Sequence, residues 1–282
     1  MLRGDQGLRV LGPADLPQVR TLLAADPVTN VFVDYRAMVT SLDKRWLGGE
    51  MWGWYSEGRL RSVCHSAANL VPAMADPEAA VAFARRAERH ARGCATLVGP
   101  VSQVRRMWDH LEHVWEAPRD ERWDQPHLVI DHDPLLPPDR SVRRTRPDEI
   151  GELYPASVAM YTEEVGVSPE AAGGASMYRA RVAQLIDRGW SFARFDEEGR
   201  VVFKAEVACA TAYAAQIQGV WVRPDLRGRG LAAAAMAAVV SQVRTTIAPT
   251  VCLYVNAHNL AARAAYRRAG FRQTETFATL MF

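Results

Sequence analysis

Apolar and polar positions in the last third of the chain predict three elements in direct succession. The run 214–222 is apolar and ends just before Pro224, which cannot pair within a central strand, so it predicts a strand. Residues 231–240 are apolar and rich in alanine, a composition that favours a helix. The segment between them contains glycines and arginines, so the pattern predicts a strand, a basic glycine loop and the start of a helix.

This loop is suited to a negatively charged ligand. The N–H groups in the first turn of a helix lack internal partners and lie at the positive end of the helix dipole. Glycines let an anion approach that backbone closely, and the arginines add positive charge. The spacing differs from the nucleotide P-loop and from the dinucleotide fingerprint. The predicted anion site comprises Arg227, Gly228, Arg229, Gly230, Leu231 and Ala232.

A second strand and helix follow. Residues 251–256 form a short apolar run that predicts a strand, and Asn259 is a good N-cap for a helix over 260–268. Arg267 and Arg268 would lie at the C-terminal end of that helix, where positive charge is favourable, and Gly270 would end it.

These motifs together resemble the GNAT superfamily of N-acetyltransferases. Arg227-x-x-Gly230-x-Ala232 is similar to the signature with which that superfamily holds the pyrophosphate of acetyl-CoA, and Asn259-x-x-Ala262-x-x-x-Tyr266 with Gly270-Phe271 follows at the expected distance. The resemblance covers roughly 142–282. It implies that acetyl-CoA is the co-substrate and that Asn259, Ala262 and Tyr266 also contact it.

The resemblance also assigns roles in catalysis. In GNAT folds the strand before the loop bulges away from its parallel neighbour, which frees backbone N–H groups for the acyl oxygen; here these belong to Val220, Trp221 and Val222. Tyr266 stands where the family places the acid that protonates the departing thiolate, and a phenol with an ordinary pKa of about 10 is protonated at neutral pH.

The proton acceptor is less clearly marked. Many GNAT enzymes have a glutamate at the position of Gln216, and an amide cannot take a proton. Glu206 on the preceding strand could replace it, lying across the sheet from Gln216 and acting through water, or it could be a solvent-facing carboxylate paired with Lys204.

The acceptor site is expected beyond the first helix of this half. Glu163 and Glu164 lie where GNAT folds build one wall of that site and could hold a cationic amine together with Gln216; alternatively, the two glutamates are only solvated. Four aromatic residues of the N-terminal half could form a pocket or belong to the core: Trp46, Trp52, Trp54 and Tyr55.

Composition sets limits on the remaining function classes. With 34 Lys plus Arg against 32 Asp plus Glu among 282 residues, the net charge of +2 gives no reason to expect nucleic acid or a membrane as partner. Cys64, Cys94, Cys209 and Cys252 are widely separated, so neither a metal site nor a disulfide framework is indicated. Residues 1–5 lack the apolar stretch of a signal peptide, and no apolar run approaches the length of a membrane span, so a cytoplasmic protein is expected.

The two halves of the chain repeat a pattern. Residues 9–19 can be laid over 143–153 as a strand, a proline turn and an acidic helix start, and both halves contain a hairpin that turns at Glu-Gly-Arg. Residues 69–76 of the first half form a loop without glycine before a helix from Glu78 to about Arg92, with Asp76 as its cap. This half is therefore not expected to bind a diphosphate at that helix.

The sequence thus predicts an α/β protein of the α+β type with two tandem GNAT-like domains, each a mixed, mostly antiparallel twisted sheet flanked by helices. A degenerate domain at 1–131 precedes a proline-rich linker at 132–140 and a catalytic domain at 141–282, as in the tandem GNAT proteins of actinobacteria that the chain resembles. The expected activity is transfer of an acetyl group from acetyl-CoA to a primary amine of a small molecule, amino-acid derivative or peptide, by a monomer or homodimer. Alternatives are a non-catalytic acyl-CoA sensor and an enzyme for longer acyl groups.

Overall fold

A computed structural model describes residues 7–89 and 92–282, so the expectation drawn from residues 1–5 lies outside the described residues. The chain divides into two compact units. The N-terminal unit contains the residues up to 127 together with 254–257 and 273–282; the C-terminal unit contains 128–253 and 258–272. The predicted domains are continuous in sequence, whereas the N-terminal unit takes its last strand from the end of the chain.

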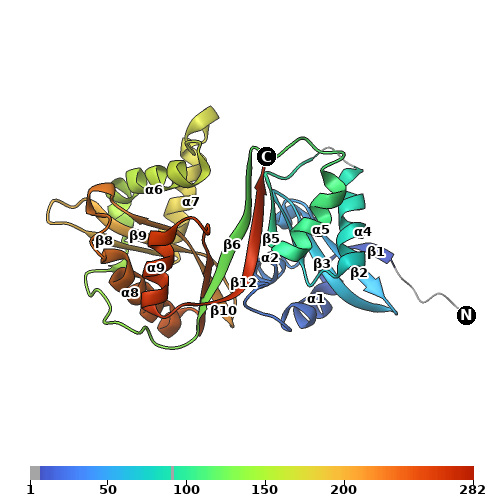
Figure 1. The fold of residues 1–282 in the computed structure, drawn as a ribbon, viewed down its shortest axis with the longest axis horizontal. Coiled ribbons are helices and arrows are strands. Elements are labelled where there is room, and N and C mark those ends of the chain that lie inside the picture. Colours follow the sequence, from blue (N-terminus) through green and yellow to red (C-terminus); the bar gives the residue numbers. More distant parts are fainter. Residues whose placement is uncertain (1–6, 90–91) are drawn as a thin grey trace, which may run out of the picture. The chain divides into compact units, whose positions relative to one another are not determined.

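The N-terminal unit is a sheet with helices on both faces (Figure 1). Its strand order is β1-β2-β3-β4-β5-β12, antiparallel throughout except for the parallel pair β4–β5. The strands are β1 (Gly7–Leu11), β2 (Glu50–Ser56), β3 (Arg59–Ser66), β4 (Asn69–Ala73), β5 (Thr96–Pro100) and β12 (Arg272–Met281). The helices are α1 (Leu16–Leu23), α2 (Val31–Thr40), α3 (Lys44–Leu47), α4 (Pro77–Glu88) and α5 (Val101–Leu111), with a 3-10 turn at η1 (Pro13–Asp15).

Two hydrophobic layers enclose this sheet because successive side chains of a strand point to opposite faces. On β2, Trp52 joins the layer under α4 and α5, whereas Met51 joins the layer under α1 and α2. Ala278 and Leu280 of β12 lie in the first of these layers. The core of the N-terminal unit therefore includes residues from the C-terminal end of the chain.

The C-terminal unit repeats this arrangement, with the strand order β7-β8-β9-β10-β11 and one parallel pair, β10–β11. Helix α6 packs with α7, and α8 packs with α9. The strands are β7 (Arg143–Arg144), β8 (Ser191–Phe195), β9 (Val201–Ala210), β10 (Ala214–Val222) and β11 (Thr250–Tyr254). The helices are α6 (Ile150–Val165), α7 (Ala175–Asp187), α8 (Leu231–Thr246) and α9 (Leu260–Ala269), with 3-10 turns at η2 (Pro147–Glu149), η3 (Ala171–Gly173) and η4 (Pro224–Leu226). Strand β6 (Asp120–Ile130) includes residues of both units.

In both units, four antiparallel strands precede a fifth strand that is parallel to the fourth. This shared order agrees with the predicted fold class and with the repeated sequence pattern. The strand 214–222 and the Asn259 cap are found as predicted. The predicted loop at 69–76 is wrong in its first part, because 69–73 form strand β4, in which Pro72 pairs with Cys64. The helix that follows is capped by Asp76 as predicted, but it ends at Glu88.

Residues 132–140 contain neither helix nor strand, yet they contact the rest of the C-terminal unit. Leu135 N–H donates to the Ala269 carbonyl at 3.1 Å, and Asp139 N–H donates to the Ala234 carbonyl at 2.9 Å. The Asp139 carboxylate also accepts from Arg194 at 2.9 Å. The proline-rich segment is thus fixed against α8 and α9.

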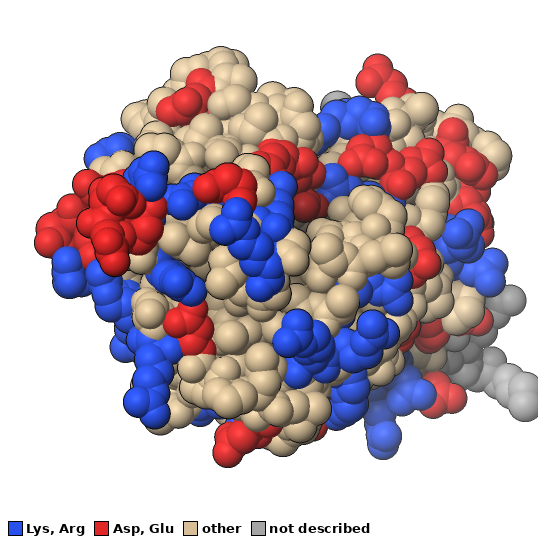
Figure 2. Space-filling model, turned by 60° about the vertical axis from the view of Figure 1, so that its left-hand side comes forward, with Lys and Arg blue, Asp and Glu red and all other residues tan. Residues whose placement is uncertain are grey.

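The remaining predictions from composition concern the surface and the cysteines. All four cysteines are buried and free. Acidic and basic side chains are interspersed on the face shown in Figure 2. None of the helices built from described residues is long and apolar enough to cross a membrane.

Candidate functional site

Strand β10 carries a bulge at Gly219. Gln218 pairs with Glu206 of β9 and Trp221 pairs with Lys204, so Gly219 and Val220 together oppose a single residue of the neighbouring strand. Gly219 has a φ of 60°, in the left-handed region that favours glycine. An extra residue of this kind leaves a backbone group outside the ladder, at the segment predicted to receive the acyl oxygen.

The second half of β10 also extends beyond its parallel neighbour. The recorded pairs with β11 join Ala214, Ala215 and Gln216 to Thr250, Val251 and Cys252. Strand β10 continues to Val222, six residues past the last of these pairs. The segment 220–222 therefore lies where the two strands no longer pair in register among the described residues.

A buried lysine braces the bulge. Lys204 has no exposed surface, and its Nζ donates to the Gly219 carbonyl at 3.2 Å and to Glu206 Oε2 at 3.0 Å. A Cβ at position 219 would lie 3.0 Å from Met160 Cε and 3.1 Å from both Glu206 Cδ and Lys204 Nζ. The backbone angle at position 219 therefore favours glycine, and a side chain there would crowd Met160, Glu206 and Lys204.

The structure places Glu206 opposite Gln218, not opposite Gln216, which pairs with Cys209. Glu206 is only 7% exposed, so it does not face solvent, but it does pair with Lys204. Its second oxygen, Oε1, accepts from Gln218 Nε2 at 2.9 Å.

Tyrosines from α6 and α7 lie near this cluster. Burial raises the pKa of Tyr178, and the charge of Glu206 raises it further. The Tyr178 hydroxyl donates to the Ser157 carbonyl at 3.0 Å, and its ring makes an edge contact with Tyr161 at 5.3 Å between centroids. Sequence reasoning gave neither Tyr178 nor Lys204 a role in the site, although Lys204 stands two residues before Glu206 and so shares its face of the strand.

The glycine loop has the geometry of an anion site. Gly228 and Gly230 have φ values of 75° and 77°, and a Cβ at Gly228 would meet no atom within 4 Å. Gly230 is the N-cap of α8 and provides no side chain to bond the first turn. In the N-terminal unit, by contrast, the Asp76 carboxylate caps α4 and accepts from Ala79 N–H at 2.8 Å. That helix already has a negative group at its N-terminus, whereas α8 has none.

Three arginines are close to the loop. Arg227 donates to the Val222 carbonyl at 2.9 Å, and Arg229 donates to the Asp225 carbonyl at 3.1 Å. Arg268 from α9 is the third: its Nη1 lies 3.6 Å from the position of a Cβ on Gly230. Sequence reasoning explained Arg268 only as a favourable charge at the end of its helix.

Glu163 connects helix α6 with the loop. It accepts from Arg227 Nη2 at 2.7 Å and from Trp221 Nε1 at 3.2 Å. The expectation that Glu163 and Glu164 lie beyond the helix is wrong, since both belong to its last turn. An acidic residue there is unfavourable for the helix dipole, and the contacts with Arg227 and Trp221 offset that cost for Glu163.

Tyr266 lies on the inner face of α9, 5% exposed, with its ring 5.8 Å from that of Phe271. Burial raises the pKa of Tyr266, and the charge of Glu164 raises it further, so the phenol is a proton donor throughout the neutral range. Asn259 Oδ1 accepts from Ala262 N–H at 3.1 Å. The N–H of Ala262, a residue predicted to contact the cofactor, is thus used within the helix cap.

Comparison with protein-family models gives two matches. Residues 157–271 match the model of the acetyltransferase (GNAT) family, and residues 49–153 match a domain of unknown function, DUF4081. No curated protein matches the chain.

Solved structures similar over the whole length show the same fold. An acetyltransferase of the GNAT family from Colwellia psychrerythraea has a TM-score of 0.60 at 13% identity, covering 98% of this chain and 99% of that one. A GCN5-related N-acetyltransferase from Sphaerobacter thermophilus has a TM-score of 0.59 at 17% identity, with 98% and 95% covered. A tandem GNAT protein from the clavulanic acid biosynthesis pathway has a TM-score of 0.54 at 16% identity, with 98% of each chain covered.

The C-terminal unit therefore contains an acetyltransferase domain of the GNAT family, and the chain as a whole has a tandem GNAT-like fold. This class of enzyme uses acetyl-CoA as acyl donor. The described residues contain no grouping of His, Cys, Asp and Glu side chains arranged to hold a metal ion.

Proposed function

We propose that the protein transfers the acetyl group of acetyl-CoA to a primary amine of a small molecule, an amino-acid derivative or a peptide. The observation that carries this proposal is the position of three features in one unit: the bulge of β10 at Gly219, the uncapped N-terminus of α8 behind Gly228 and Gly230, and the protonated phenol of Tyr266. These supply, in turn, donors for an acyl oxygen, a site for a diphosphate and an acid.

The donor side of the site fits coenzyme A. A diphosphate needs backbone N–H groups that it can approach and positive charge beside them. The open side of Gly228 and the absent cap at Gly230 meet the first need, and Arg229 and Arg268 meet the second. In this proposal Arg227 exchanges its contact with Glu163 for the phosphates.

The reaction requires two proton movements. The amine loses a proton and its nitrogen bonds to the acetyl carbonyl carbon; the carbon–sulfur bond then breaks and the thiolate takes a proton. Backbone N–H groups around 220–222 stabilise the oxyanion between these steps. We assign protonation of the thiolate to Tyr266 and acceptance of the amine proton to Glu206, directly or through water.

On the acceptor side, Glu163 and Glu164 at the end of α6 would attract a cationic amine. Tyr178 and Tyr161 would border the same space, next to Glu206. Gln216 is 9% exposed, so little of its side chain is open to an acceptor.

Release of free CoA thiol with a panel of amines tests this function. Acceptor-dependent release that is absent without enzyme supports the proposal. An enzyme that binds acetyl-CoA but releases no thiol with any amine, including small amines, amino-acid amides and peptides, contradicts it.

A second candidate is a sensor that binds acyl-CoA without turning it over. It is favoured by one observation: Gln216 stands where many GNAT enzymes have a glutamate, and both oxygens of the substitute Glu206 already have partners, Lys204 and Gln218. In the same assay the sensor binds acetyl-CoA tightly and leaves the thioester intact.

A further inference from the structure

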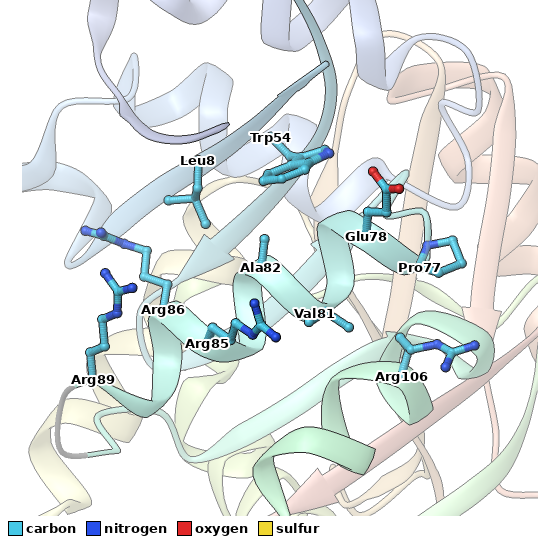
Figure 3. Close-up of a pocket in the computed structure, with 10 residues that line it drawn as sticks. All are labelled: Leu8, Trp54, Pro77, Glu78, Val81, Ala82, Arg85, Arg86, Arg89 and Arg106. Carbon is cyan, nitrogen blue, oxygen red and sulfur yellow. The ribbon is translucent and has the colours of Figure 1, made fainter. Parts of the chain in front are cut away.

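A groove of about 700 Å³ lies on the N-terminal unit, along helix α4 (Figure 3). Leu8 of β1 and Trp54 of β2 extend over the helix from one side and face Ala82. These residues give the groove an apolar and aromatic wall. The sequence left open whether Trp54 is a core or a pocket residue; the structure packs it against the hydrophobic layer under α4 and α5 and also places it in this lining.

The rest of the lining is strongly basic. Arg85, Arg86 and Arg89 come from α4 and the residue after it, and Arg106 comes from α5, against a single acid, Glu78. Such a density of positive charge on one groove is unusual for a chain whose charges are nearly balanced.

Most of this charge is uncompensated. Arg86 pairs with Glu50 at 2.7 Å, but Arg85, Arg89 and Arg106 form no ion pair with any described residue. Glu88, the acid three positions from Arg85, contacts His110 instead. Three guanidinium groups are therefore available to a ligand.

The charge of a helix end does not account for this set. Arginines are favourable near the C-terminus of a helix, and this explains the arginines of α4. It does not explain Arg106, which belongs to another helix, nor the indole and leucine that line the same groove.

We propose that this groove binds a small organic anion that carries phosphate groups and a flat or apolar part. Guanidinium groups bind phosphate oxygens in pairs of parallel hydrogen bonds, and an indole covers a flat ring well. The site differs from a GNAT diphosphate loop, because the N-terminus of α4 is occupied by Asp76 and the arginine side chains do the binding. It assigns a binding role to the unit whose family model has no known function, and it is independent of acetyl transfer.

ADP is the probe, because it joins a diphosphate to a flat base. Isothermal titration calorimetry is carried out on full-length protein that carries Arg227→Gln and Arg229→Gln. These two changes weaken the binding of ADP to the glycine loop of the C-terminal unit. On this background Arg85→Gln/Arg89→Gln is compared with Arg59→Gln/Arg61→Gln, which removes the same charge from exposed positions of β3 in the same unit. All four arginines are exposed, so each variant should keep its melting temperature.

ADP should bind, and the groove variant should bind it about tenfold more weakly or worse, as expected for lost charge-assisted hydrogen bonds. The control pair should stay within about twofold, as the residual effect of net charge. Pyrophosphate should bind more weakly than ADP, adenosine should not bind, and ADP should slow hydrogen exchange in 77–89. Absence of ADP binding, or equal affinity in groove and control variants, overturns the proposal. Titration of the wild-type protein with CoA tests the proposed function separately.

Discussion

Lys204, Glu206 and Gly219 are the most constrained residues of the candidate site. A fully buried ammonium group is costly unless it is paired, and here its partners are the carboxylate of Glu206 and the carbonyl of the bulge. The pair therefore connects two tasks, holding the bulge in shape and placing a carboxylate beside the proposed acceptor.

Glu206→Gln, alone and combined with Lys204→Met, separates these two tasks. It should lower the turnover number at neutral pH by about 100-fold if Glu206 accepts the amine proton, and it should lower the free energy of unfolding by about 3 kcal/mol because Lys204 loses its partner. Adding Lys204→Met should restore much of the stability but none of the turnover. A single variant with full activity would exclude Glu206 as the base.

Tyr266→Phe removes the proposed acid with little change of shape. The turnover number should fall by about 100-fold, while the affinity for CoA should change less than about twofold, since the phenol acts on the leaving thiolate. Steady-state kinetics and calorimetry on the same preparation check both parts. Unchanged turnover would leave Tyr266 as a packing residue against Phe271.

At the scale of elements, two helices at equivalent places in the two units differ at their N-termini. Helix α4 begins with a carboxylate cap, Asp76, and a proline, whereas α8 begins with Gly230 in the left-handed region. The first arrangement stabilises the helix by itself, and the second leaves the first turn open to a ligand.

Gly230→Ala should therefore weaken CoA binding by about tenfold or more, because alanine strains the left-handed backbone and fills the approach to the phosphates. Gly58→Ala is the matched control. Gly58 has a φ of 72° and no neighbour within 4 Å of a Cβ, so this change should cost similar stability without affecting CoA. Equal CoA affinity in both variants would remove the loop from the site.

Much of the C-terminal unit could be predicted because its signals are local. Strand 214–222, the glycine loop and the Asn259 cap follow from short stretches of sequence, and the structure places them as expected. The bulge at Gly219, the displacement of Glu206 from Gln216 and the approach of Arg268 to Gly230 depend on pairing and packing between distant segments. Of these, only the bulge has a local sign in the sequence, the glycine inside the strand at 219.

At the scale of the whole molecule, the clearest consequence of nonlocal pairing is the last strand. Strand β12 pairs with β5, with Leu280 opposite Leu97, and both side chains are fully buried. A division into continuous domains could not anticipate this. The groove along α4 was also missed, because its arginines read as an ordinary solvated helix face.

The stability of the N-terminal unit should depend on two buried histidines. Burial lowers the pKa of His65 to about 4 and that of His127 to about 4. Each is lower in the folded state than the unfolded value of about 6.5, so their stabilising contribution is complete above pH 6.5 and is lost as the pH falls from there toward 4.

The free energy of unfolding should accordingly fall by on the order of 2–3 kcal/mol per histidine across this window. Thermal melts between pH 7.5 and pH 4.5 measure the fall, and His65→Gln/His127→Gln should flatten it. A wild-type melting temperature that stays level from pH 7 to pH 5 would show that neither side chain is held neutral by burial.

Calorimetric titration of the full-length protein with CoA tests the central claim most directly. The account predicts one CoA bound per chain at the loop 227–232, with affinity that falls at least about tenfold in Arg229→Gln/Arg268→Gln, because two guanidinium groups near the diphosphate are lost. Well-folded protein that takes up no CoA, or that binds it equally well without these arginines, would contradict the account.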